Sequence, residues 1–169
     1  ADLRVAEYLR INPNAKIPAI RHHTSAPVPV TVFESGAILL YLAEAYGGLL
    51  GATPVARAQT LSWLFLQVAG LGPMLGNAAH FRSRKSTDHY AIGRFEGEVQ
   101  RHFDMLQARL QEVEWLNGEA YSVADIAHFS WVRSASYAGL DLKDFPILHG
   151  WVEKIEGRKA TARALARLT

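Results

Sequence analysis

The chain has 169 residues, 49% of them hydrophobic, enough for one large domain or two small ones, and its formal net charge of +2 is too small to favour nucleic acid as a partner. It contains no cysteine, which excludes a disulfide framework, a thiolate metal site and a thiol nucleophile of its own. It has no apolar run near the length of about 18 residues that a membrane span needs and no leader pattern, so we expect a soluble, cytoplasmic protein without a membrane partner.

The N-terminal pattern predicts a short helix followed by a β-hairpin. Residues 3–11 are weakly amphipathic, and the helix is expected to end before the Asn-Pro pair at 12–13, because the residue before a proline avoids helical backbone. Residues 17–20 and 28–33 are rich in β-branched side chains and flank a polar segment. They indicate the two strands of a hairpin, with prolines at strand starts or edges.

A second helix is predicted over residues 35–46, ending at a pair of glycines. It is apolar nearly all round, which predicts that it is buried. The composition changes near residues 48–53, and from there on the pattern is almost wholly helical. We therefore expect a mixed α/β unit over residues 1–47, a linker over 48–53 and an all-helical domain over 54–169.

The helical part opens with a threonine cap followed by a proline at the first helical position. This helix is expected to bend or break at the glycine- and proline-rich segment 70–73. A long amphipathic helix is predicted over residues 88–116, and two further helices around 144–156 and 159–168. The apolar stripe of the long helix, with spacings of three and four residues, consists of Ile92, Phe95, Val99, Phe103, Leu106, Leu110 and Val113.

Ser122 and Asp125 have the spacing of a capping box, in which a serine caps the first amides of a helix and an acid three residues later reaches back. The helix that follows is apolar enough to be central. The pair could be misread as half of a hydrolase triad, but the cap explains both residues and there is no G-x-S-x-G nucleophile elbow. We therefore expect a structural role for both.

Two short motifs point to a binding site. A cis Ile17-Pro18 bond would leave the preceding backbone facing a groove, where a ligand backbone can pair like another strand; an ordinary trans bond is the alternative. Glu34-Ser35 opens a helix whose free amides favour a carboxylate, while Glu34 could hold an ammonium; the alternative is that Ser35 only caps the helix. In this order and spacing they indicate a small site for an extended, anionic, peptide-like ligand.

The other candidates for chemistry are weaker. The seven histidines have no H-E-x-x-H motif and no cysteine partner, so no metal site is expected. Arg82, Arg84 and Lys85 are expected in a solvated loop. Arg94 lies off the apolar stripe near the start of the long helix, where it could grip a carboxylate bidentately or remain solvated.

With these motifs the chain resembles bacterial cytosolic glutathione transferases of the nu class, over essentially all of its 169 residues. The resemblance implies the C-terminal part of a thioredoxin-like domain followed by the all-helical glutathione transferase C-terminal domain, an α+β fold that is mainly α. It also implies a homodimer with glutathione as co-substrate. The motifs that carry it are Lys16-Ile17-Pro18-Ala19-Ile20, Phe33-Glu34-Ser35-Gly36-Ala37-Ile38, Gly70-Leu71-Gly72-Pro73-Met74-Leu75-Gly76 and Tyr121-Ser122-Val123-Ala124-Asp125.

The resemblance assigns roles to individual residues. The backbone of Ile17, ahead of a cis Pro18, would pair with the cysteinyl part of glutathione. Glu34 and Ser35 would hold the γ-glutamyl end, and Lys16 would approach the glycyl carboxylate. These roles place every part of the tripeptide on the first 47 residues of the chain.

The helical part has implied roles too. Arg94 matches an arginine that reaches the glutathione of the partner subunit, and Asn77 stands where the family has a glutamine. The acceptor pocket would be lined by apolar residues, which indicates an acceptor that is not highly charged. These residues are Met74, Phe81 and Trp131, and the alternative is that they are core residues.

One departure from the family pattern is large. The β-α-β unit that begins the thioredoxin-like fold is absent, and it carries the groups that activate the thiol, so we expect an N-terminally incomplete chain without a catalytic residue of its own. The hairpin should then expose an unpaired edge and an apolar face.

The resemblance implies a glutathione transferase, with glutathione-dependent disulfide reduction as the most expected activity, acting on a small electrophile or disulfide. Such an enzyme would activate the thiol of bound glutathione, so it would need no cysteine of its own. The alternative is a catalytically inactive glutathione-binding protein with a scaffold or regulatory role. A preceding segment with a hydroxyl or amide side chain in its first loop would favour the enzyme.

Overall fold

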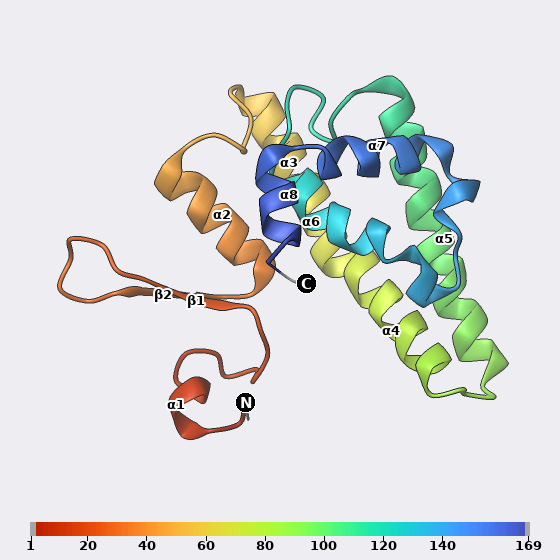
Figure 1. The fold of residues 1–169 in the computed structure, drawn as a ribbon, viewed down its shortest axis with the longest axis horizontal. Coiled ribbons are helices and arrows are strands. Elements are labelled where there is room, and N and C mark those ends of the chain that lie inside the picture. Colours follow the sequence, from red (N-terminus) through yellow and green to blue (C-terminus); the bar gives the residue numbers. More distant parts are fainter. Residues whose placement is uncertain (1–2, 168–169) are drawn as a thin grey trace.

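The computed structural model describes residues 3–167. Figure 1 shows a short helix and a β-hairpin at one end of the molecule and a bundle of helices forming the rest. In that part of the chain, no helix is long and apolar enough to cross a membrane. The elements are α1 (Ala6–Leu9), β1 (Ala19–His22), β2 (Val30–Phe33), α2 (Ser35–Tyr46), α3 (Pro54–Leu66), a π-helical turn η1 (Gln67–Leu71), α4 (Gly72–Ser83), α5 (His89–Glu112), α6 (Val123–Arg133), η2 (Ala135–Ala138), η3 (Leu142–Asp144), α7 (Pro146–Glu156) and α8 (Lys159–Leu165).

The long helix α5 is shorter than the predicted 88–116, for local reasons. The Asp88 side chain caps its start by accepting a hydrogen bond from the Ala91 N–H (2.9 Å). Extended backbone at Val113 (φ −139°, ψ 154°) ends it. Helix α7 begins two residues later than expected, at a proline in the first helical turn.

The first and last helices are also shorter than the predicted segments. Helix α1 is a single turn inside the predicted 3–11, and no side chain caps its start. Helix α8 begins at the predicted residue and ends at Leu165; position 168 of the predicted helix lies outside the described residues.

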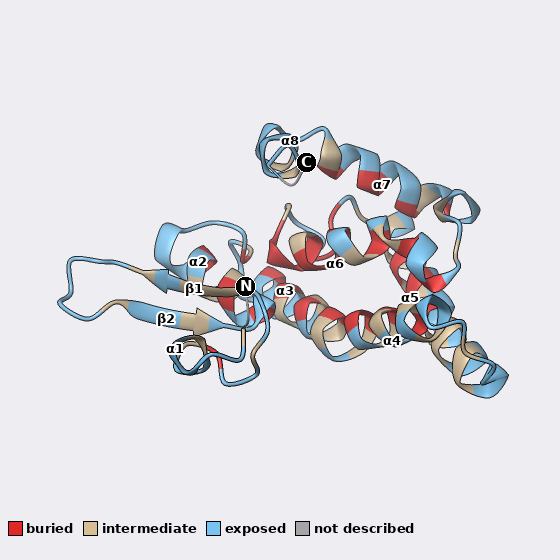
Figure 2. Cartoon of the chain, turned by 60° about the horizontal axis from the view of Figure 1, so that its bottom comes forward, coloured by how far each residue is buried: buried red, intermediate tan, exposed pale blue. Residues whose placement is uncertain are grey.

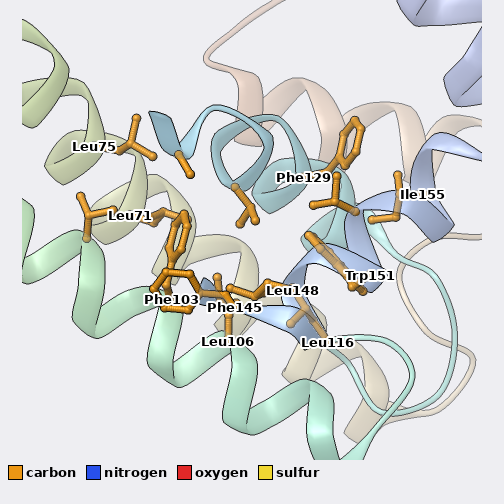
Figure 3. Packing of buried hydrophobic residues seen from close by; sticks show 14 of the residues in the cluster. Leu71, Leu75, Phe103, Leu106, Leu116, Phe129, Phe145, Leu148, Trp151 and Ile155 are labelled. Atoms are coloured by element: carbon orange, nitrogen blue, oxygen red, sulfur yellow. The ribbon is translucent and has the colours of Figure 1, made fainter. Parts of the chain in front are cut away.

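The main core lies among α4, α5, α6 and α7 (Figure 3). From the predicted stripe of α5, Val99, Phe103 and Leu106 are buried, and the ring of Phe103 packs edge-to-face on Phe145 at a centroid distance of 5.1 Å. The stripe therefore packs as its spacing predicted, with its two ends only partly buried.

The predicted bend at 70–73 is a π-helical turn, not a break, so α3, η1 and α4 follow one another without a loop. Gly70 faces α5 closely, because a Cβ at this position would lie 2.5 Å from Nε2 of His102. The close packing of the π-helical turn against α5 therefore requires a residue without a side chain at position 70.

The capping box at the start of α6 is present as predicted. Asp125 accepts hydrogen bonds from the N–H of Ser122 (2.9 Å), from its hydroxyl (2.8 Å) and from the N–H of Leu116 (3.1 Å). Both residues of the box are fully buried, and burial raises the pKa of Asp125 while these hydrogen bonds oppose the rise. The N–H of Val123 donates to the carbonyl of Leu49 (2.9 Å), which ties α6 to the segment after α2.

The prediction that α2 is buried nearly all round is wrong. Its buried residues are Gly36, Ile38 and Ala43, on the side of the helical bundle, whereas Leu42 is 36% and Tyr46 71% exposed (Figure 2). Apolar composition alone did not reveal that one side of this helix lacks a covering layer among the described residues.

Strands β1 and β2 pair antiparallel, from Ala19 opposite Phe33 to His22 opposite Val30. They form a two-stranded sheet. Val30 and Phe33 are more than a third exposed. Because these two residues are three positions apart on β2, they point to opposite faces of the sheet, and the exposed apolar face expected for the hairpin stays a prediction.

Candidate functional site

A cavity of about 300 Å³ lies between the N-terminal region and the helical bundle. Four of the five predicted binding residues line it, namely Lys16, Ile17, Glu34 and Ser35. The full lining is Asn12, Asn14, Lys16, Ile17, Pro18, Glu34, Ser35, Gln67, Val68, Gly72, Pro73 and Trp131. Segments that are far apart in the sequence therefore form one site, as the spacing of the first two motifs predicted.

The first wall is the segment that leads into β1. The Ile17-Pro18 peptide bond is cis, so the trans alternative is wrong. The Ile17 side chain is 74% exposed, and its N–H makes no hydrogen bond within the described part of the chain. This amide is available to a ligand at the cavity wall.

The second wall is the start of α2. Ser35 is the first helical residue and Glu34 precedes it, and no side chain caps this end, so the alternative that Ser35 merely caps the helix is wrong. Among residues 3–167, neither side chain has a hydrogen bond or ion pair. The helix N-terminus therefore presents unpaired amides, a hydroxyl and a carboxylate together.

Glu34 has left-handed backbone, with φ 68° and ψ 125°. A non-glycine residue held in such a sparsely populated region costs about 1–3 kcal/mol, and such residues gather at ligand sites. The carbonyl of Glu34 still accepts the first helical hydrogen bond, from Ile38 (2.9 Å). The strained backbone therefore belongs to a residue that lines the cavity.

The third wall comes from the helical bundle. Gln67 and Val68 belong to the π-helical turn, and Trp131 belongs to α6. Gln67 is 4% exposed, yet its side-chain amide makes no hydrogen bond with any described residue. Gly72 allows the close approach, since a Cβ there would lie 2.7 Å from Nε2 of Gln67. A buried amide with free hydrogen-bonding groups at a cavity is a ligand-binding feature.

Sequence reasoning missed Gln67, Asn12 and Asn14 as lining residues. A signal for Gln67 was present, because it is the single polar residue in the apolar run 64–71. The two asparagines belong to the informative stretch that leads into the Ile17-Pro18 motif, but no ligand-binding role was predicted for them.

Of the predicted acceptor-pocket residues, Trp131 lines the cavity but Met74 and Phe81 do not. Met74 packs against the main core, and the Phe81 ring stacks on Phe95 at 5.6 Å. Asn77 donates a hydrogen bond back to the carbonyl of Pro73 (2.8 Å) and lies outside the lining. Apolar character could not separate core residues from cavity residues here.

The prediction of a solvated loop for Arg82, Arg84 and Lys85 is partly wrong. Arg82 belongs to α4 and forms an ion pair with Glu96 of α5 (2.5 Å). Arg84 and Lys85 follow the helix and are exposed. The helix reaches farther than predicted because its last turn includes Arg82 and ends at Ser83.

Arg94 lies outside this cavity, on the exposed side of α5. Its guanidinium forms an ion pair with Glu98 (2.7 Å), which Arg101 also contacts (2.9 Å). The hydrogen bonds from Arg101 and then Arg94 lower the pKa of Glu98 to about 2. The expectation that Arg94 reaches a partner subunit stays a prediction.

Comparison with known proteins decides the family. The family model "Glutathione S-transferase, N-terminal domain" matches residues 2–44, and "Glutathione S-transferase, C-terminal domain" matches residues 81–159. The Escherichia coli disulfide-bond oxidoreductase YfcG is 49% identical over 164 residues, covering 95% of this chain and 76% of YfcG. The chain belongs to the glutathione transferase family. The E. coli disulfide-bond oxidoreductase YghU is 36% identical, but the chain covers only 57% of its length.

Solved structures agree with this family. A glutathione transferase family member from Pseudomonas fluorescens with two glutathione bound has a TM-score of 0.88 and 37% identity, over 96% of this chain and 76% of that one. A glutathione transferase from Pseudomonas putida with glutathione disulfide bound has a TM-score of 0.89 and 36% identity, over 96% and 74%. The predicted fold class, a thioredoxin-like N-terminal region followed by the helical glutathione transferase domain, is confirmed.

Proposed function

We propose that this protein is a nu-class-like glutathione transferase that acts as a glutathione-dependent disulfide reductase. The observation that carries the proposal is the cavity itself. It combines the unpaired Ile17 amide with the free Glu34 carboxylate, the free Ser35 hydroxyl and an uncapped helix N-terminus. The names of YfcG and YghU as disulfide-bond oxidoreductases support the same reaction class.

Each group of the site matches one part of glutathione. The Glu34 carboxylate would bind the γ-glutamyl ammonium, and the Ser35 hydroxyl with the first amides of α2 would bind the adjacent carboxylate. The Ile17 amide would pair with the cysteinyl backbone. Lys16, which lines the same cavity, would bind the glycyl carboxylate.

The reaction is a thiol–disulfide exchange. The glutathione thiolate attacks one sulfur of a disulfide, forms a mixed disulfide and releases the other sulfur as a thiolate, which takes up a proton. A second glutathione attacks the mixed disulfide and yields glutathione disulfide and the second thiol. The chain has no cysteine, so both attacking thiols would come from glutathione. The Gln67 side-chain amide, which lines the cavity and has no hydrogen bond to the described residues, would stabilise a thiolate there.

We further propose a cytoplasmic homodimer. Chemistry that depends on reduced glutathione and uses no protein thiol suits a reducing compartment. A dimer would also give Arg94 a role, because it lies outside the cavity of its own chain. Sedimentation analysis of the purified chain measures the oligomeric state, and a monomer at micromolar concentration would contradict this part of the proposal.

A catalytically inactive glutathione-binding protein is the second candidate. One observation favours it: Ser35 supplies the single hydroxyl among the described residues that line the cavity, and the proposed binding mode uses it for a carboxylate. Titration calorimetry with glutathione, followed by glutathione oxidation with bis(2-hydroxyethyl) disulfide as acceptor, separates the candidates. Binding with turnover supports the reductase, binding without turnover supports the inactive protein, and no binding refutes both.

A further inference from the structure

Two side chains hold one carbonyl of the cavity wall, one from Tyr8, outside the cavity lining, and one from Asn12, within it. The Tyr8 hydroxyl and the Asn12 side-chain amide both donate hydrogen bonds to the carbonyl oxygen of Lys16, each at 2.6 Å. We call Tyr8 and Asn12 the carbonyl clamp. A carbonyl oxygen has two lone pairs, so the clamp uses its full hydrogen-bonding capacity.

The clamp fixes the direction of the next amide. Within residues 3–167 only the Ile17-Pro18 peptide bond is cis, so the preceding Lys16–Ile17 peptide bond is trans and planar. In a trans peptide the N–H points opposite to the C=O. Because Tyr8 and Asn12 hold the Lys16 carbonyl on one side, the Ile17 N–H is directed to the other side, where it makes no hydrogen bond within the described chain.

The surrounding loop is built to hold this orientation. Asn12 is 1% exposed, and its side-chain oxygen accepts a hydrogen bond from the Asn14 N–H (2.9 Å). Its own carbonyl accepts from the N–H of Ala15 (3.1 Å), which has left-handed backbone with φ 53°. The side-chain amide, the side-chain oxygen and the backbone carbonyl of Asn12 therefore all bond within the segment that leads to Ile17.

Two hydrogen bonds to one carbonyl also polarise its peptide group, which makes the N–H on the other side a better donor. We infer that Tyr8 and Asn12 are positioning residues for the cysteinyl part of glutathione: they orient and strengthen the Ile17 amide without contacting the ligand through the groups that form the clamp. This inference rests on the proposed function, because it assigns the Ile17 amide to glutathione.

The inference makes a prediction about ligand parts. Removing one donor should weaken the binding of a ligand that pairs with the Ile17 amide, and should spare a ligand that reaches only Glu34 and Ser35. Glutathione is the first ligand, and γ-glutamyl methylamide, which keeps the γ-glutamyl zwitterion but lacks the cysteinyl carbonyl, is the second. A general disturbance of the fold would weaken both.

The experiment measures dissociation constants of both ligands by NMR titration for wild type, Tyr8→Phe and Asn12→Ala. We expect each variant to raise the constant for glutathione by about 3- to 10-fold, as for one lost hydrogen bond, and to leave that for γ-glutamyl methylamide within about 2-fold. Tyr41→Phe, which removes a hydroxyl bonded to His22 instead, is the matched control and should change neither. Thermal unfolding checks that the variants are folded.

Equal weakening of both ligands, or unchanged glutathione binding by folded Tyr8→Phe, would overturn the inference. A wild-type chain that binds γ-glutamyl methylamide as tightly as glutathione would overturn it too, since the Ile17 amide would then contribute nothing. If the wild-type chain binds neither ligand, the proposed function fails first, and the inference fails with it. Because only the wild type decides that outcome, the two failures are distinguishable.

Discussion

The helical part and the N-terminal part of this molecule differ in how much apolar surface they bury. In the helical part, residues 54–167, side chains from α4, α5, α6 and α7 form a continuous core. In the N-terminal part, residues 3–47, the buried hydrophobic residues are Ile38 and Ala43. Large apolar residues such as Phe33 and Tyr46 are exposed there. The helical part therefore has the packing that stabilises a fold, while the N-terminal part has little of it among the described residues.

The ligand-contacting groups are distributed in the opposite way. The N-terminal part provides the uncapped helix end, the Ile17 amide and the free Glu34 and Ser35 side chains. The helical part adds Gln67 and Trp131 from elements that the core holds in place. The comparison teaches that the weakly packed part supplies most of the polar recognition, and that the core supplies a fixed surface against which the ligand is held.

The strongest test of this contrast compares two phenylalanines. Phe103 is fully buried and Phe33 is 38% exposed. Phe103→Ala should lower the free energy of unfolding by about 3–5 kcal/mol, because it leaves a cavity in the core, and Phe33→Ala should lower it by about 1 kcal/mol or less. Denaturant unfolding of both variants measures the difference. Equal losses would show that the hairpin is as well packed as the bundle, and the contrast would be wrong.

A second test uses acid to protonate a buried group of the helical core. His128 of α6 is fully buried, its Nδ1 bonds the Ala124 carbonyl (2.9 Å), and its Nε2 has no partner among the described residues. Burial lowers its pKa from 6.5 to about 4. Between these pH values the unfolded chain binds more protons than the folded one, so the free energy of unfolding falls as pH decreases from 6.5 to 4, by about 3 kcal/mol in all.

The measurement for this prediction is denaturant unfolding at several pH values. His128→Phe should flatten the decrease between pH 6.5 and 4, since it removes the group that gains a proton. His149→Gln, at an exposed position of α7, is the control and should keep the wild-type slope. If His128→Phe also keeps the wild-type slope, another group causes the acid sensitivity.

A third test acts where the two parts meet. A Cβ at Gly36 of α2 would lie 2.9 Å from Cγ2 of Val68 in the π-helical turn, so Gly36→Ala must shift one of them. We expect a loss of about 1–3 kcal/mol in the free energy of unfolding together with weaker glutathione binding. Gly97→Ala is the matched control, since a Cβ there meets nothing within 4 Å. It should raise the free energy of unfolding by up to about 1 kcal/mol, because alanine favours a helix over glycine. A Gly36→Ala variant with wild-type stability and binding would show that this contact does not hold α2 in place.

The sequence predicted best what depends on local pattern. The capping box of Ser122 and Asp125, the stripe of α5 and the hairpin all follow from spacing, and the structure contains them. The start of α2 also followed from the Glu34-Ser35 motif, because a helix N-terminus is a local feature. These features need no knowledge of distant contacts.

What the sequence did not predict depends on tertiary contacts. Whether α2 is buried depends on what covers its second side, which its own composition does not contain. Whether Met74 or Trp131 lines the cavity depends on how α4 and α6 turn relative to the N-terminal part. The clamp of Tyr8 and Asn12 on Lys16 depends on the path of a loop that has no periodic pattern.

The smallest expected effect on stability, and the sharpest on recognition, comes from Ser35→Ala. Ser35 is exposed, caps nothing and has no hydrogen bond to other residues described here, so the free energy of unfolding should stay within about 0.5 kcal/mol of wild type. Calorimetry should show glutathione binding weakened by about 10- to 100-fold, as for a lost hydrogen bond to a charged group. Ser62→Ala, which removes an exposed hydroxyl bonded to the Ala58 carbonyl in α3, should leave binding unchanged. Unchanged affinity in folded Ser35→Ala would refute this assignment, because a residue with no structural task would then have no binding task either.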